Sequence, residues 1–395
     1  MAMTIGLIDV DGGKFPNLCL MKLSAWHKEQ GDQVHLLYPE DVLLGNNLFQ
    51  AYEKLYAACV FTQNQGLSIR LAEIGAEIGG TGTTSAAQLP AHIEHMRPDY
   101  SLYNIQGIAY GFLTRGCPRA CPVCIVGWKE GYESHKVADL NEFWHGERII
   151  KLLDPNILAA KEHMELLEQL THSGAWIDFT QGLDARLLTP ENMDLLSACK
   201  VKMLHFAWDN PKDWSVPRAL SAFAKRTSVT DFRKRRVYVL VNYWSTHEED
   251  LARVYWLKDH AYDPYIMVYD KPNAPVTARR LQRWVNNKII FRSCDRFIVF
   301  ISGAITGVDG YRKIFADAER WLREQDCTVL NPAVLPPSGM EWEAYLRITK
   351  AMVREADIVY VLKNWEYSRG VKEELALAES LGKEIIYEPR EVVIV

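Results

Sequence analysis

The spacing of apolar residues divides the chain into three consecutive patterns, each of which mixes short strands with helices. In the first pattern, the apolar runs at 4–10 and 34–38 predict buried strands, and they flank an amphipathic helix at 18–29 that ends at a Gly-Asp pair. A further strand is predicted at 57–61, before a glycine-rich turn at 79–82. This pattern indicates a small α/β layer, which we assign to residues 1–100.

Between residues 105 and 285 a strand is followed by a helix six times over. Helices are predicted at 159–170, 190–198, 216–225 and 247–258, and the strands at 108–114, 149–153, 176–180, 202–208, 236–243 and 264–269. Such alternation favours parallel strands joined by right-handed crossovers. Six units predict a partial (β/α)6 barrel over residues 101–290, with its site at the carboxyl ends of the strands.

The third pattern begins after residue 296 and predicts a doubly wound α/β domain over residues 291–395. Its strands are expected at 297–302, 327–331, 358–362 and 385–387, with helices at 311–325, 342–355 and 370–381. The fold class predicted for the whole chain is therefore α/β.

Composition adds few constraints. The 395 residues are 48% hydrophobic and 24% charged with a formal charge of −5, which is ordinary for a globular protein. No run of about 18 apolar residues and no cleavable leader is visible, so we expect a cytoplasmic protein that does not enter a membrane. A basic run from Lys225 to Arg236 either contacts phosphates or is a solvated helix end, which leaves direct binding of nucleic acid open.

Three of the eight cysteines, Cys117, Cys121 and Cys124, follow the first strand of the second pattern with the spacing C-x3-C-x2-C. Three thiolates hold a [4Fe–4S] cluster and leave one iron open, where S-adenosylmethionine (SAM) can chelate through its amino and carboxylate groups. A structural zinc site needs a fourth ligand, and no nearby cysteine or histidine supplies one before His135. Zinc and a redox dithiol remain the alternatives.

This motif, on a loop after a barrel strand, resembles that of the radical SAM superfamily, and the resemblance extends over about residues 105–285. One departure is that Val123 stands where the family often has an aromatic residue. The N-terminal layer is similar in order to the cobalamin-binding domain that precedes many radical SAM barrels. Its Asp-x-His-x-x-Gly pattern is absent after Asp9, so no cobalamin is expected.

Two further segments, at 153–156 and 181–186, resemble radical SAM proteins with this N-terminal layer. By their position at strand ends, Asp154, Gln181 and Arg186 are expected to bind the methionine or ribose portion of SAM. Asp209 is a further candidate of the same type. The alternative is that Asp154 caps a turn and that Asp184 and Arg186 form a local ion pair.

The last domain carries a strand that runs into a small-residue loop at Ser302-Gly303, and a helix start at Ser368-Arg369-Gly370 that favours phosphate binding. These segments resemble the nucleoside 2-deoxyribosyltransferase superfamily over residues 297–388, particularly its nucleoside-monophosphate N-glycosidase branch and related phage-associated domains. The resemblance implies that Glu374 attacks the anomeric carbon and that Ser302, Gly303, Ser368, Arg369 and Gly370 bind phosphate or sugar.

One residue departs from that family. The aspartate that assists the leaving base falls near Thr349, and Glu341 or Glu343 can replace it only if their loop folds over the site. The alternative for Glu374 is a solvated carboxylate beside Glu373.

Taken together, these features predict a radical SAM enzyme that modifies a nucleotide or nucleic-acid-derived substrate, reduced by a donor such as flavodoxin or ferredoxin. Its last domain is expected to bind or hydrolyse a nucleoside monophosphate. A radical SAM enzyme acting on a peptide or protein, and a non-catalytic iron–sulfur sensor, are the rival hypotheses.

Overall fold

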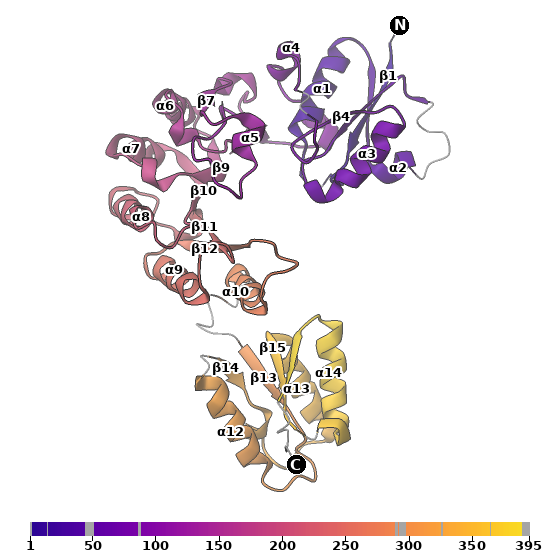
Figure 1. Ribbon diagram of the computed structural model, residues 1–395, viewed down its shortest axis with the longest axis vertical. Helices are drawn as coiled ribbons and strands as arrows, with labels where there is room; N and C mark the ends of the chain where they lie inside the picture. Colours follow the sequence, from indigo (N-terminus) through magenta and orange to yellow (C-terminus); the bar gives the residue numbers. More distant parts are fainter. Residues whose placement is uncertain are drawn as a thin grey trace. The chain divides into compact units, whose positions relative to one another are not determined.

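The computed structural model describes residues 2–13, 15–43, 51–85, 88–288, 291, 298–324, 327–363 and 365–388. The chain divides into two compact units, Met1–Tyr265 and Ile266–Val395. Within the described ranges no helix is both long enough and apolar enough to cross a membrane. The mixed α/β architecture with parallel sheets that the hydrophobic pattern predicts is confirmed (Figure 1).

The first sheet contains β1 (Thr4–Asp9), β2 (Gln33–Leu37), β3 (Lys54–Ala58) and β4 (Glu77–Gly79) in the order β2-β1-β3-β4, all parallel. Its helices are α1 (Leu18–Glu29), α2 (Pro39–Leu43), α3 (Gln65–Glu73) and α4 (Ala91–Glu94). The strand expected at 57–61 ends earlier, because the backbone N–H groups of Val60 and Phe61 donate to the carboxylate of Asp11 at 2.6 and 3.3 Å.

The second sheet has six strands whose spatial order follows the chain: β5 (Ile108–Gly111), β8 (Ile149–Leu152), β9 (Trp176–Leu183), β10 (Lys200–Ala207), β11 (Arg235–Val241) and β12 (Asp263–Val268). The pairs from β5 through β11 are parallel. The connecting helices are α5 (Val126–Glu130), α6 (His163–Ser173), α7 (Pro190–Ala198), α8 (Ser215–Arg226) and α9 (His247–Asp259). Helices α6 to α9 form a row along one side of the sheet (Figure 1).

The predicted alternation of six strands with helices is therefore present, with shifts at the ends. Helix α7 begins where predicted, because Thr189 forms a capping box with Asn192 and Pro190 occupies the first turn. Helix α6 begins at His163 and not at 159, because residues Ile157–Ala159 form a 3-10 turn after which Ala160 is extended. The antiparallel ribbon of β6 (Thr114–Arg115) and β7 (His135–Lys136) was not predicted.

The third sheet, in the second unit, contains β13 (Ile298–Ser302), β14 (Thr328–Leu330), β15 (Ile358–Val361) and β16 (Glu384–Tyr387) in the order β14-β13-β15-β16, all parallel. Its helices are α12 (Tyr311–Glu324), α13 (Trp342–Glu355) and α14 (Arg369–Ser380), and α10 (Val276–Asn286) precedes the sheet. Alternate residues of β13 face opposite cores, since Val299 and Ile301 pack with α12 whereas Phe300 packs with α13 and α14. Helices thus cover both faces of this sheet.

One buried arginine ties the second sheet to its helices at the carboxyl ends of the strands. Arg253, on α9, is 2% exposed and donates to the carbonyl oxygens of Trp208 at 2.6 Å and Leu240 at 3.0 Å. It also forms an ion pair with Asp250 at 2.5 Å. These bonds join the ends of β10 and β11 to α9.

We expect Arg253→Met to lower the free energy of unfolding of the first unit by about 3–5 kcal/mol, because the buried carboxylate of Asp250 loses its ion-pair partner and buried carbonyl groups lose a donor. The control is Arg226→Gln, which removes an ion pair with Asp194 at the surface and is expected to change stability little. Urea unfolding followed by tryptophan fluorescence measures both variants. Equal effects of the two substitutions would contradict the role given to Arg253.

Candidate functional site

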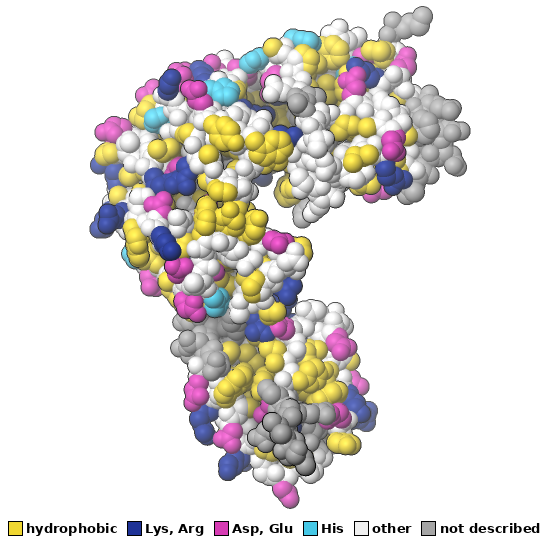
Figure 2. All heavy atoms as spheres, viewed as in Figure 1, with side chains coloured by type: hydrophobic (Ala, Val, Ile, Leu, Met, Phe, Trp, Pro, Cys, Tyr) yellow, Lys and Arg dark blue, Asp and Glu magenta, His cyan; other side chains and the backbone are white. Residues whose placement is uncertain are grey.

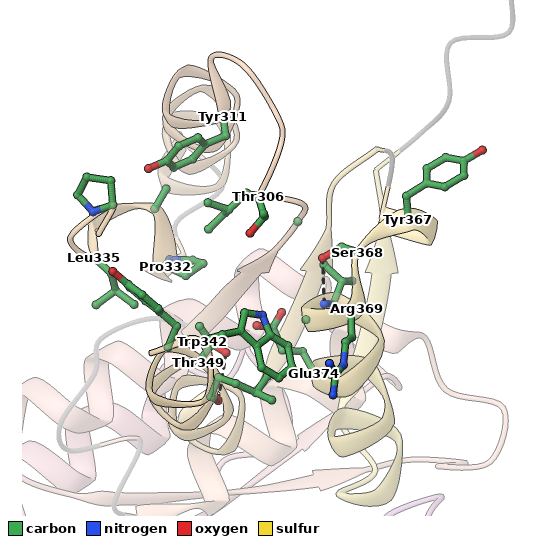
Figure 3. Close-up of a pocket in the computed structure, with 18 of the residues that line it drawn as sticks. Thr306, Tyr311, Pro332, Leu335, Trp342, Thr349, Tyr367, Ser368, Arg369 and Glu374 are labelled. Carbon is green, nitrogen blue, oxygen red and sulfur yellow. Dashed lines mark hydrogen bonds between the residues drawn. The ribbon is translucent and has the colours of Figure 1, made fainter. Parts of the chain in front are cut away.

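The second unit contains a pocket with a volume of about 440 Å³. Three segments line it: the loop after β13, residues 332–337 with the start of α13, and the start of α14 (Figure 3). Five residues singled out from the sequence lie in its wall, namely Gly303, Ser368, Arg369, Gly370 and Glu374. Residues from two distant segments therefore meet around one cavity.

Glu374 lies in this wall as a buried carboxylate, 6% exposed, and is not the solvated residue of the alternative hypothesis. The hydroxyl of Ser302, itself fully buried, donates to its Oε2 at 2.6 Å. Burial raises the pKa of Glu374, whereas hydrogen bonds from Ser302 and Thr349 and the charge of Lys350 act in the opposite direction. Ser302 thus positions Glu374 and does not itself line the pocket.

The start of α14 offers positive potential to the pocket. Ser368 caps the helix by accepting the N–H of Val371 at 3.3 Å, and the first N–H groups of a helix have no partner within it. The guanidinium of Arg369 lies over the ring of Trp342, with its carbon 4.5 Å from the ring centroid. Figure 3 shows Ser368, Arg369 and Trp342 around the same cavity. An anion is the ligand that such a helix start favours.

Gly303 is needed for a different reason from the one that the sequence suggested. A Cβ atom there would lie 2.8 Å from the side chain of Leu362 and 3.0 Å from that of Phe315. The glycine therefore makes room for the core under the pocket. Gly303 lines the pocket on one side while the side chains of Leu362 and Phe315 occupy the space that its Cβ atom would fill.

The described pocket wall contains no second acidic residue that could assist the leaving base, as the sequence led us to expect. Thr349 is 8% exposed and lies beside Glu374, at the place where the resemblance implied an aspartate. Glu341 and Glu343, at the start of α13, do not belong to the pocket wall. Among the described residues that line the pocket, Glu374 alone carries a carboxylate.

Sequence reasoning missed the apolar wall of this pocket. Tyr311, Trp342 and Tyr345 line it together with a proline-rich turn that includes Pro336 and Pro337. The sequence did carry one signal for this wall, an aromatic residue at the start of a helix and three residues after a Pro-Pro-Ser-Gly segment. Flat apolar walls of this kind suit a nucleobase or another planar group.

The segment with the three cysteines follows β6, and several backbone contacts hold it. The N–H of Cys117 donates to the carbonyl of Gly131 at 3.1 Å, and the N–H of Cys124 donates to that of Cys121 at 3.0 Å. Gly116 has φ +79°, and a Cβ atom there would lie 2.1 Å from the carbonyl oxygen of Glu133, so only glycine fits.

All three thiols are free, and that of Cys124 belongs to an exposed residue. Within the described ranges, no three His, Cys, Asp or Glu side chains are gathered as they would be around a metal ion. The donor set itself is suited to iron–sulfur chemistry. In addition, the amide of Asn156, a residue 2% exposed, donates to the sulfur of Cys117 at 3.6 Å, and its buried Oδ1 has no partner.

Asp154, which was expected to contact SAM, has other partners in the structure. Its side chain accepts the N–H of Leu113 at 3.0 Å and both the N–H and the hydroxyl of Thr114, the latter at 2.7 Å. Burial raises its pKa to about 6. These bonds fix the backbone just before the cysteines, as in the turn-capping alternative, and contact with a cofactor stays a prediction.

Arg186 likewise forms the local ion pair that the alternative described, because its Nε donates to Asp184 at 2.7 Å. Arg119, between the first two cysteines, lies 3.6 Å from the same carboxylate. Burial raises the pKa of Cys121, and the charge of Asp209, two residues beyond the end of β10, acts in the same direction, so these two side chains are also close. The cysteine segment therefore meets the carboxyl ends of β9 and β10.

Gln181 is exposed and lies at a β-bulge between β9 and β10. Leu204 pairs with Phe179 and Phe206 with Leu183, so two steps along β10 correspond to four along β9. Such a bulge redirects the side chains at the end of a strand. No described contact yet links Gln181 to the cysteines, and its role stays a prediction.

The basic run is largely paired within the fold. Arg226, Arg233 and Arg236 form ion pairs with Asp194, Asp231 and Asp263, in that order. On the face seen in Figure 2, Lys and Arg side chains are interspersed with Asp and Glu. The run is therefore mostly structural.

Comparison with known proteins gives one family match. Residues 297–387 match the family described as "Domain of unknown function (DUF4406)". This segment spans β13 to β16 and contains the pocket wall described above. A search of curated proteins finds no match.

The environment of Glu374 predicts its titration. We expect its pKa to lie above the ordinary value of 4.5, and Ser302→Ala to raise it further by removing a bond that favours the ionised form. Because the folded pKa is raised, the stability that this group contributes is present at low pH and is lost as the pH rises through that value.

Carboxyl-carbon NMR titration, assigned with Glu374→Gln, measures this pKa. The neighbouring Glu373 is an internal control, since its hydrogen bond to Lys350 lowers the pKa. A pKa of Glu374 at or below that of Glu373 would contradict this description of the pocket.

Proposed function

We propose that this protein is a radical SAM enzyme that modifies a nucleotide or nucleic-acid-derived substrate, with a second unit that binds and slowly hydrolyses a nucleoside monophosphate. The observation that carries the first half is the place of the C-x3-C-x2-C segment. It follows the first of six strands in sequential order, and Arg119 within it contacts Asp184 at the end of β9.

The second sheet supports this proposal through its topology. Sequential strand order, parallel pairing and helices along one side are the properties of a (β/α) barrel, and we propose that residues 101–290 form such a partial barrel. In (β/α) barrels the site lies at the carboxyl ends of the strands, where the cysteine segment is found.

In this proposal Cys117, Cys121 and Cys124 hold a [4Fe–4S] cluster and leave one iron open to SAM. When bound and reduced, such a cluster would supply one electron for cleavage of SAM into methionine and a 5′-deoxyadenosyl radical. Asp154 fixes the backbone that precedes the cysteines, and Asn156 donates to the sulfur of Cys117. Gln181 and Arg186 are proposed to bind SAM, and a flavodoxin or ferredoxin is the proposed electron donor.

The pocket supports the second half of the proposal. The start of α14 and Arg369 bind the 5′-phosphate, and the aromatic wall holds the base. Glu374 attacks C1′, so that the bond from C1′ to the base breaks and the base leaves with the electron pair. A water molecule protonates the base and becomes hydroxide, and hydroxide attacks C1′ of the glycosyl ester, which releases the sugar phosphate and restores the carboxylate.

The matched family supports the fold in this proposal and not the reaction, because DUF4406 domains are linked in some proteins to a nucleoside deoxyribosyltransferase-like fold. One observation favours a second candidate function for this unit. The described pocket wall has a single carboxylate, which is also what a domain that binds a nucleotide without hydrolysing it would have. The rival proposal, a radical SAM enzyme that acts on a peptide or protein with this unit as a non-catalytic binding module, predicts instead that the unit binds no nucleoside monophosphate.

Anaerobic reconstitution tests the cluster. We expect about four irons per chain, because three thiolates hold one cubane, and 5′-deoxyadenosine from SAM after reduction with dithionite. Cys121→Ala should abolish both. The control Cys199→Ala, a buried cysteine at the end of α7, should change neither. Full iron content in the Cys121 variant would contradict the assignment, and an intact cluster without 5′-deoxyadenosine would favour the sensor hypothesis.

A panel of deoxynucleoside monophosphates tests the pocket. We expect slow release of free base by the wild type, and Glu374→Gln should lower it by at least about 100-fold while binding measured by calorimetry changes little. The control Glu373→Gln alters the exposed neighbour and should retain activity. Binding without base release by the wild type would establish the binding module, and absence of binding would contradict the nucleotide assignment.

A further inference from the structure

A groove of about 470 Å³ runs between α8 and α9 in the first unit. Trp214, Arg218 and Lys225 line one side of it. Trp214 is the N-cap residue of α8, and the successive spacings of four and seven residues place the three side chains on one side of this helix. Trp256 of α9 and His260, the C-cap residue of that helix, line the other side and are again four residues apart.

The aromatic residues of this groove present ring surface to solvent. Trp214 is 62% exposed, which is unusual for the largest apolar side chain. Trp256 stacks on His260 with the ring centroids 3.8 Å apart, and it meets Trp208 edge-on at 5.4 Å. Trp256 is thereby held rigid, whereas the ring of Trp214 remains available for stacking.

The charge of the groove has one sign. Its wall contains Arg218 and Lys225 and no aspartate or glutamate. Within the part of the chain that the structure describes, neither cation has an ion-pair partner, although the neighbouring Arg226 pairs with Asp194. Of these two cations, only Lys225 belongs to the basic run described above.

We propose that this groove binds single-stranded nucleic acid, with a base stacked on Trp214 and backbone phosphates at Arg218 and Lys225. Stacking on an exposed aromatic ring and phosphate contacts to unpaired cations are the two interactions by which proteins hold single strands. An acidic peptide would use the cations but not the ring. The groove and the nucleotide pocket share no residue, so that each assignment can fail without the other.

Fluorescence anisotropy with labelled single strands of about twelve nucleotides tests the proposal, with the full-length protein and both DNA and RNA probes. We expect Trp214→Ala to weaken binding at least about 5-fold through loss of stacking. The double variant Arg218→Gln/Lys225→Gln should reduce the slope of log K against log salt by about 1.4, since each phosphate contact contributes about 0.7 on single strands.

The matched control is Trp321→Ala/Arg320→Gln on α12. Trp321 is 48% exposed, but Arg320 already pairs with Asp317, so this variant should bind as the wild type does. Circular dichroism verifies that all variants are folded. The proposal is overturned if the wild type binds no single strand in low salt, if the control weakens binding equally, or if polyglutamate displaces the probe as well as an unlabelled strand does.

Discussion

The parallel direction of the strands is the constraint on which both candidate sites depend. In the second sheet it brings the segments that follow β5, β8, β9 and β10 to one edge, where Arg119 meets Asp184 and Asp154 meets the backbone of Thr114. In the third sheet it brings the loop after β13 beside the start of α14, which follows β15. Polar residues far apart in the sequence thus gather at the carboxyl ends of parallel strands.

Asp154 and Glu374 are both buried carboxylates at these edges, but they have different hydrogen-bond partners. This difference gives Asp154 a structural role and leaves the chemical role to Glu374. Asp154 accepts backbone N–H groups as well as a hydroxyl, so its oxygens are engaged in holding the chain. Glu374 has hydroxyl partners, Ser302 and Thr349, and lies in the wall of a cavity. Because its partners are hydroxyl groups and it lies in a cavity wall, the carboxylate of Glu374 retains oxygen lone pairs that can contact a substrate. We therefore propose the chemical role for Glu374.

The sequence predicted local features well and long-range ones poorly. Helices α1 and α7 have the predicted bounds because their caps, Asn17 and Thr189, are encoded within a few residues. The group Ser368 to Glu374 was predicted as a unit because one helix start carries it. By contrast, the wall around Trp342, the contact between Asp154 and Leu113, and the pairing of Arg280 with Glu384 join segments that no local pattern relates. For the same reason the sequence did not reveal the groove between α8 and α9, of whose lining only Lys225 belongs to the basic run.

The most direct test of the central claim is electron paramagnetic resonance of the reduced protein before and after addition of SAM. Cys117, Cys121 and Cys124 supply three thiolates for four irons, so that SAM should bind the remaining iron. We predict the signal of a single reduced [4Fe–4S] cluster whose g-values shift when SAM is added. A signal that SAM leaves unchanged, with the cluster fully assembled, would contradict the account.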